Sequence, residues 1–148
     1  MKRLIDVHSG EVIAGQGEVV LKSDTTSPCL VFTAYDSVHK IGCLAHALFL
    51  SGPSKEIEST FLKDASHAID EMISDMTLLG ARKDDIEVCL LTGENVSHKD
   101  EDMIYSHNIA SAVDLLKQKR VKLKRNAPSD VGRSHVVLDV ESGSISYA

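Results

Sequence analysis

The residue types that could carry out nucleophilic chemistry gather between Ser23 and His46. Cys29 begins the apolar run CLVFTAY, and His46 lies in the next apolar run, IGCLAHALFL. A cysteine attacks as its thiolate, and a neighbouring imidazole can take the thiol proton or stabilise the ion pair that results. A hydroxyl group can complete such a site by holding the imidazole in one orientation. The hydroxyl residues just upstream of Cys29 are Ser23, Thr25, Thr26 and Ser27.

Cys29 can meet His46 if the two apolar runs pair as the arms of a hairpin around the turn DSVHK. Facing residue numbers in an antiparallel pair have a constant sum. A turn centred between Ser37 and Val38 makes that sum 75 and sets Cys29 opposite His46, with Cβ atoms about 4.5–5.5 Å apart. A turn centred on Val38 makes the sum 76 and directs His46 to the other face. Both registers are open, and so is the interpretation of Cys29 and His46 as ordinary core residues.

The elements that would position these residues are strands with two helices among them. Apolar residues at helical spacing predict a first helix from Ile57 to Leu79, with Gly80 just past its end. NIASAVDLLKQKR predicts a second helix. Strands are expected in GEVVLKS, CLVFTAY, IGCLAHALFL, IEVCLL, VKLKR, SHVVLDV and SISY. The expected fold is therefore an α+β layered sandwich with mixed, largely antiparallel sheets and two main helices, formed as a single domain over residues 1–148.

Composition sets broad limits on the class of protein. The chain has 148 residues, of which 43% are hydrophobic and 26% charged, so it can bury a substantial core. The net charge of −6 argues against a nucleic-acid or anionic-membrane partner. No apolar run approaches the roughly 20 residues of a membrane helix, and the N-terminus lacks the apolar stretch of a secretory signal. Three widely spaced cysteines form neither a disulfide framework nor a zinc pattern, so a cytoplasmic protein without membrane insertion is expected.

The stretch SPCLVFTAYDSVHKIGCLAHALFL resembles the signature of the CheD family, the chemoreceptor glutamine deamidases. That signature has a cysteine strand, a turn with aspartate, Lys-x-Gly, and Ala-His before an apolar stretch, with the spacing seen here between Cys29 and His46. Ser23 stands where the family carries a threonine. The likeness continues through LGARKDDIEVCLLTGEN, IYSHNIASAVDLLKQKRVKL and VGRSHVVLDVESGSI, over roughly 120 residues in all.

The resemblance implies hydrolysis of side-chain amides, with Cys29 as nucleophile, His46 as general base and acid, and Ser23 orienting the imidazole. It implies no metal and no organic cofactor. The implied partners are methyl-accepting chemoreceptor helices and a CheC-type phosphatase, with no nucleic acid. Candidates for holding the oxyanion or the substrate are Ser27, Thr26, Gly93 and Asn108.

Several family glycines are replaced, which leaves open a catalytically weak or inactive module that binds receptors or a CheC-type phosphatase. SPC stands in place of Gly-Ser-Cys, and Pro28 has no backbone N–H to offer an oxyanion. Glu94 and Tyr105 also replace glycines, and PSDVGR replaces a glycine pair. Losing one oxyanion donor typically costs about 10²–10³ in rate.

Two further hypotheses belong to other classes. A metal or redox role could use His98, His107, Cys43 and Cys89, but these residues lack the spacing of ligands. Binding of nucleic acid could use KQKRVKLKR, which has six basic residues in nine. Net acidity and few aromatic residues argue against the second.

Overall fold

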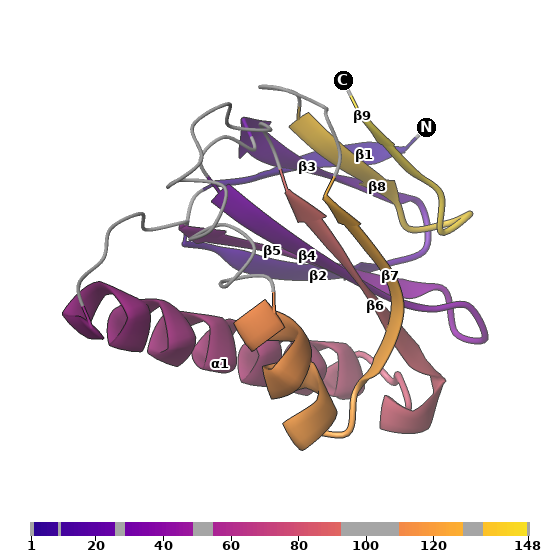
Figure 1. Cartoon of the computed structure of the whole chain (residues 1–148). Helices are drawn as coiled ribbons and strands as arrows, with labels where there is room; N and C mark the ends of the chain where they lie inside the picture. The colour runs from indigo at the N-terminus through magenta and orange to yellow at the C-terminus, as the bar shows by residue number, and fades with distance from the viewer. Residues whose placement is uncertain are drawn as a thin grey trace.

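The computed structural model describes residues 2–8, 10–25, 29–48, 55–92, 110–128 and 135–147. Two β-sheets stack face to face, and helices cover the outer face of the larger sheet (Figure 1). The strands are β1 (Arg3–Val7), β2 (Val12–Gln16), β3 (Val19–Thr25), β4 (Cys29–Asp36), β5 (Ile41–Leu48), β6 (Ile86–Thr92), β7 (Lys122–Pro128), β8 (His135–Asp139) and β9 (Ile145–Tyr147). The helices are α1 (Lys55–Leu78), the 3-10 turn η1 (Lys83–Asp85), and a helical stretch over residues 110–118.

The smaller sheet has the strand order β1-β3-β8-β9, and the larger has the order β2-β5-β4-β6-β7. The pairs β1–β3 and β6–β7 are parallel, and the other neighbouring pairs are antiparallel. The predicted α+β layered sandwich, with mixed and largely antiparallel sheets and two main helices, is therefore confirmed. Strands β1 and β2 were not among the strands predicted from the sequence.

Both faces of β4 are covered, which explains its uninterrupted apolar run. Phe32 is fully buried and packs toward the helices, in a cluster that contains Ile69 and Met72 of α1. Val31 points the other way, into a second cluster between the two sheets that includes Leu138 of β8. The two layers of core on either side of the larger sheet hold β4 and β5 at the centre of the molecule.

The hairpin of β4 and β5 pairs Cys29 with Leu48 and Val31 with His46. Both predicted registers are wrong, because the facing residue numbers sum to 77 and a four-residue turn over 37–40 separates the strands. The difference from the register that set Cys29 opposite His46 is two residues, and a shift of two keeps every position on its original face. Cys29 and His46 thus occupy one face of the sheet as diagonal neighbours rather than as a facing pair.

Asp36 stabilises this longer turn. Its Oδ1 accepts hydrogen bonds from the backbone N–H groups of Val38 (2.9 Å) and His39 (3.1 Å). Its Oδ2 accepts from Nδ1 of His39 (2.8 Å) and from the N–H of Arg82 (3.2 Å), beyond the end of α1. Burial by itself would raise the pKa of this carboxyl, but the His39 ring and the N–H donors outweigh burial and hold the pKa below its ordinary value.

Replacing Asp36 with alanine is expected to lower the free energy of unfolding by about 2–4 kcal/mol, because three partly buried N–H donors would lose a charged acceptor. Urea unfolding of the two proteins measures the difference. Asp84→Ala is the matched control, since the Asp84 side chain is exposed and its loss should cost no more than about 0.5 kcal/mol. Equal midpoints for Asp36→Ala and wild type would show that the turn does not depend on this carboxylate.

The glycine of the Lys-x-Gly sequence has a packing role. A Cβ built on Gly42 would lie 3.1 Å from Cδ2 of Leu138 and 3.1 Å from Cγ2 of Val140. Lys40, two residues earlier, has a φ of 54° and closes the turn in the left-handed region. The motif therefore combines a left-handed turn residue with a position where the smaller sheet leaves no room for a side chain.

Candidate active site

The predicted catalytic residues come from both sheets. Ser23 lies on β3 of the smaller sheet, whereas Cys29 and His46 lie on β4 and β5 of the larger one. Residues two apart on a strand point to the same face of the sheet, so Ser23 shares a face with Leu21, and His46 shares a face with Leu44. Both leucines belong to the core cluster between the sheets. The side chains of Ser23 and His46 consequently face the interior between the two layers, where they are 2% and 1% exposed.

His46 is a buried imidazole whose ring makes no hydrogen bond to the part of the chain that the structure describes. The backbone is held firmly, since the His46 N–H donates to the Glu11 carbonyl (3.1 Å) and the His46 carbonyl accepts from the Gly10 N–H (2.7 Å). Buried polar atoms in folded proteins are nearly always hydrogen-bonded, and exceptions mark strain or a functional group. His46 is therefore the most unusual polar side chain in the described part of the interior.

Burial lowers the pKa of His46 below its ordinary value, and the negative charge of Asp24 opposes that shift without cancelling it. The ring is consequently neutral at pH 7, with one nitrogen protonated and the other carrying a free lone pair. A neutral imidazole can accept a proton, which is the property that a general base needs.

Acid should destabilise the fold partly through His46. The unfolded chain protonates this ring at about pH 6.5, whereas the folded protein binds the proton only at lower pH. The unfolded state then holds more protons, so the free energy of unfolding falls as pH decreases through this range, by at most about 1.4 kcal/mol per pH unit from one group. When urea unfolding is measured at several pH values, the free energy of unfolding should change less steeply with pH for His46→Asn than for wild type. The exposed residue His67 supplies the control His67→Asn, and identical slopes for all three proteins would contradict the prediction.

The hydroxyl of Ser23 is already engaged. It donates to the carbonyl of Asp24 (2.7 Å) and accepts from the N–H of Val136 on β8 (2.9 Å). A hydroxyl oxygen has two lone pairs, so one remains after these bonds are made. Ser23 can therefore act on a neighbouring imidazole only as an acceptor.

Cys29 is described through its backbone, as the first residue of β4; its side chain lies outside the description. Diagonal neighbours in an antiparallel pair are about 7–8 Å apart, with the Cβ atoms closer, which is within reach of long side chains. The register thus places the backbone positions of Cys29 and His46 as diagonal neighbours on one face of the sheet.

The remaining predicted site residues lie outside the described residues. They are Thr26, Ser27, Gly93 and Asn108, together with the replaced glycine positions at Pro28, Glu94 and Tyr105 and the two histidines His98 and His107.

Two histidines near Ser23 were missed as site residues. Nδ1 of His8 lies 3.1 Å from Oδ1 of Asp24, and this hydrogen bond is the main reason that the pKa of His8 is raised. Nδ1 of His135 lies 2.7 Å from the carbonyl oxygen of Ser23. His135 is 112 positions from Ser23 along the chain, so no local pattern in the sequence could have paired them.

The chain is similar to known proteins over most of its length. A family model described as CheD chemotactic sensory transduction matches residues 50–147. The chain belongs to the CheD family. "Probable chemoreceptor glutamine deamidase CheD" of Chlorobium luteolum is 30% identical over 142 residues, covering 95% of this CheD-family chain and 70% of the relative. The protein of the same name from Pyrococcus abyssi is 26% identical over 148 residues, covering 98% of this chain and 91% of the relative.

The predicted resemblance to CheD is thus confirmed. The family model begins after Ser23, Cys29 and His46 in the chain, so the family assignment does not depend on those residues. Among solved structures, the Neisseria meningitidis protein NMB0706, of family-model DUF152, matches with a TM-score of 0.55 and 11% identity. That match covers 88% of this chain and 65% of the Neisseria chain, so the CheD-family chain spans less than two thirds of that protein. The likeness concerns the fold alone.

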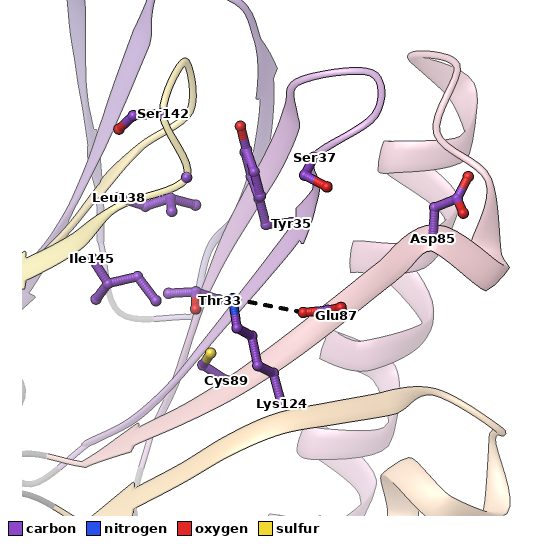
Figure 2. A pocket seen from close by; sticks show the side chains of 11 residues that line it. Thr33, Tyr35, Ser37, Asp85, Glu87, Cys89, Lys124, Leu138, Ser142 and Ile145 are labelled. Carbon is purple, nitrogen blue, oxygen red and sulfur yellow. Dashed lines mark ion pairs between the residues drawn. The ribbon is translucent and has the colours of Figure 1, made fainter.

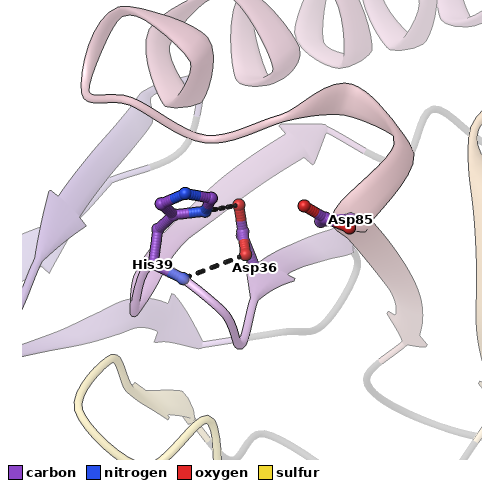
Figure 3. Close-up of side chains that lie close together, drawn as sticks. All are labelled: Asp36, His39 and Asp85. Atoms are coloured by element: carbon purple, nitrogen blue, oxygen red, sulfur yellow. Dashed lines mark hydrogen bonds and ion pairs between the residues drawn. The ribbon is translucent and has the colours of Figure 1, made fainter.

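One cluster in this CheD-family chain has the residue types of a metal site. The possible ligand atoms of Asp36, His39 and Asp85 lie within 4.8 Å of one another (Figure 3). Both carboxylate oxygens of Asp36 already accept hydrogen bonds, one of them from the His39 ring. Those hydrogen bonds stabilise the β4–β5 turn, and this structural role explains why Asp36 and His39 lie together.

A recess of about 260 Å³ opens between the larger sheet and the β8–β9 hairpin (Figure 2). Tyr35 and Cys89 line it, and at its edge Nζ of Lys124 lies 3.7 Å from Oε2 of Glu87. The recess lies toward the β4–β5 turn, whereas His46 pairs with Val31 nearer the other end of the strands. It does not contain the predicted catalytic residues.

Three of the six basic residues in KQKRVKLKR make internal contacts. Nζ of Lys119 lies 2.8 Å from Oδ1 of Asp70, and Nζ of Lys122 donates to the Asp84 carbonyl at 2.6 Å. Lys124 has its ion pair with Glu87. The two ion pairs, of Lys119 and Lys124, reduce the positive charge that a nucleic acid would meet. Separately, none of the helices in the described residues is both long and apolar enough to cross a membrane.

Proposed function

We propose that this chain is a cysteine-dependent deamidase that hydrolyses the side-chain amides of chemoreceptor glutamines to glutamate. Family membership and the names of the relatives support the reaction class. The observation that carries the proposal for this chain is the buried, neutral imidazole of His46, which has no partner among the described residues and lies one diagonal step from Cys29.

In the first half-reaction, His46 accepts the thiol proton of Cys29, and the thiolate attacks the carboxamide carbon of a receptor glutamine. A tetrahedral intermediate forms. Its C–N bond then breaks while the His46 imidazolium returns the proton to the departing nitrogen, which leaves as ammonia. The products are a thioester on Cys29 and a neutral His46.

In the second half-reaction, water replaces ammonia. His46 takes a proton from the water molecule as its oxygen attacks the thioester carbon. The C–S bond breaks, which regenerates the Cys29 thiolate beside a protonated His46. The carboxylic acid released on the glutamate side chain ionises to solvent, so no metal or redox cofactor is required by the balance of the reaction.

Ser23 would act as a hydrogen-bond acceptor. Its proton is committed to the Asp24 carbonyl, so the free lone pair of its Oγ can receive one N–H of His46. Such a bond selects the tautomer whose bare nitrogen is directed away from Ser23 and is available to Cys29. Apo enzymes often have loose catalytic hydrogen bonds that tighten when substrate binds.

The oxyanion of each tetrahedral intermediate requires donors near Cys29. Thr26, Ser27, Gly93 and Asn108 remain the proposed sources of these donors, as hydroxyl, backbone N–H or side-chain amide groups. Pro28 cannot contribute an N–H, so the site must draw its donors from the other positions.

The experiment is incubation of the purified protein with chemoreceptor signalling fragments, followed by mass spectrometry of the receptor peptides. Conversion of specific glutamines to glutamates by wild type, and its loss in Cys29→Ala and His46→Ala, is the expected result. Retained receptor binding without conversion across several receptors would contradict the proposal and would identify a binding module instead. A CheC-type phosphatase remains a predicted second partner.

A further inference from the structure

Strand β3 carries a bulge at the predicted site. Lys22 pairs with Val137 and Thr25 pairs with His135 on β8, so the two residues between them on β3 face Val136 alone. One extra residue in one strand of an antiparallel pair defines a β-bulge. Bulges are common beside active sites, where they redirect a side chain. This one contains Ser23, the residue proposed to orient His46.

Two side chains hold the bulge together. The N–H of Val136, which would meet a backbone carbonyl in a regular ladder, donates to Oγ of Ser23 at 2.9 Å. The Ser23 hydroxyl donates in turn to the Asp24 carbonyl at 2.7 Å. The displaced carbonyl of Ser23 accepts a hydrogen bond from Nδ1 of His135 at 2.7 Å. Since a carbonyl oxygen can only accept, the proton of this bond must reside on Nδ1 of His135.

The arrangement makes the orientation of Ser23 depend on His135. Without the imidazole donor, the half-buried Ser23 carbonyl would lack this partner, and an unpaired polar group in such a place favours a different local backbone. A regular ladder would restore the pairing by drawing the Ser23 carbonyl toward β8 and turning its hydroxyl away. Asp24 is the other bulge residue, and its negative charge acts on the pKa of His46. The Asp24 carboxylate would move together with Ser23.

We infer that His135 is a positioning residue, whose Nδ1–H holds the Ser23–Asp24 bulge so that the free lone pair of Ser23 is presented to the His46 ring. This inference rests on the proposed function, in which Ser23 orients His46 for reaction with Cys29. His135 does not touch the reacting atoms and acts through Ser23. A small displacement of an orienting group can cost about 10²-fold in rate.

The test compares His135→Ala with His135→Asn, because the asparagine amide can place an N–H donor close to the position of Nδ1. For His135→Ala we expect kcat for receptor deamidation to fall about 10- to 100-fold with KM unchanged. His135→Asn should recover most of that loss. The control Asp84→Ala removes an exposed carboxylate of η1, away from the predicted catalytic residues, and should leave kcat unchanged. Equal losses in His135→Ala and His135→Asn, or no loss in either, would overturn the inference.

A second measurement separates this inference from the proposed function. The ring nitrogen resonances of His46 in ¹⁵N-histidine-labelled protein report its tautomer and need no substrate. We expect His135→Ala to change them and His135→Asn to restore them, whether or not any receptor is turned over. Unchanged His46 resonances in a folded His135→Ala protein would contradict the role of His135. Absence of receptor deamidation by wild type would contradict the proposed function alone.

Discussion

Replacing His46 with asparagine is expected to lower kcat for glutamine deamidation by about 10²–10⁴-fold, the usual contribution of a general acid–base group. The imidazole is buried and neutral, and neither of its nitrogens has a partner among the described residues. In the proposed mechanism its free lone pair takes the proton of the Cys29 thiol. Both half-reactions need this ring, first to remove the thiol proton and then to activate water. Steady-state conversion of a receptor fragment measures the loss.

The stability of His46→Asn distinguishes catalysis from folding. The His46 ring makes no hydrogen bond to a described residue, so no such bond is lost on substitution. The free energy of unfolding of the variant should therefore lie within about 1.5 kcal/mol of the wild-type value near neutral pH. Asp84→Asn, at an exposed position of η1, is the control for activity. Wild-type turnover by a folded His46→Asn protein would refute the proposed role of His46.

Replacing Cys29 with alanine should have the largest effect, a loss of about 10⁴-fold or more, because no other group in the proposed mechanism can form the thioester. The measurement is the same receptor assay, run to long times so that residual turnover is detected. Receptor binding should persist, since the substitution removes only a thiol.

The other cysteines provide the control for this variant. Cys89 is 7% exposed on β6, and burial raises the pKa of Cys43 far above its ordinary value, which makes that thiol inert. Cys89→Ala should retain wild-type kcat. Activity that survives in Cys29→Ala but disappears in Cys89→Ala would move the nucleophile to the recess between the sheets.

The strongly patterned elements could be predicted from the sequence. The apolar spacing from Ile57 to Leu79 identified α1, and Gly80 follows it with a φ of 112°. Apolar residues on both faces of CLVFTAY predicted a strand covered on two sides, and β4 lies between the two core clusters. Such patterns predict structure because buried positions are occupied by apolar residues, and their spacing differs between helices and strands.

The first two strands and the hairpin register could not be predicted in the same way. In β1, Leu4 is 58% exposed, so the strand lacks a clean alternation of apolar and polar residues. In β2, Gly15 weakens the strand pattern. The register depends on four hydrogen bonds to Asp36, one of which comes from Arg82 beyond α1. That contact is a tertiary one, and a turn motif alone does not reveal it.

The catalytic site stays a prediction, and part of its geometry could not be predicted from the sequence. Ser23 and His46 are both buried between the sheets. The bulge at Ser23 and its bond from His135 arise from pairing between β3 and β8, which are more than a hundred residues apart in sequence. Interactions across such distances depend on the assembled sheet.

The most direct test of the central claim, that His46 serves as the base for Cys29, is the rate of Cys29 alkylation by iodoacetamide at several pH values, read by mass spectrometry of the Cys29 peptide. Because the His46 ring is neutral at pH 7, it can take the thiol proton as the sulfur reacts. At pH values below the ordinary cysteine pKa of about 8.5, we therefore expect faster alkylation in wild type than in His46→Asn. Equal alkylation rates in the two proteins across this pH range would contradict the claim.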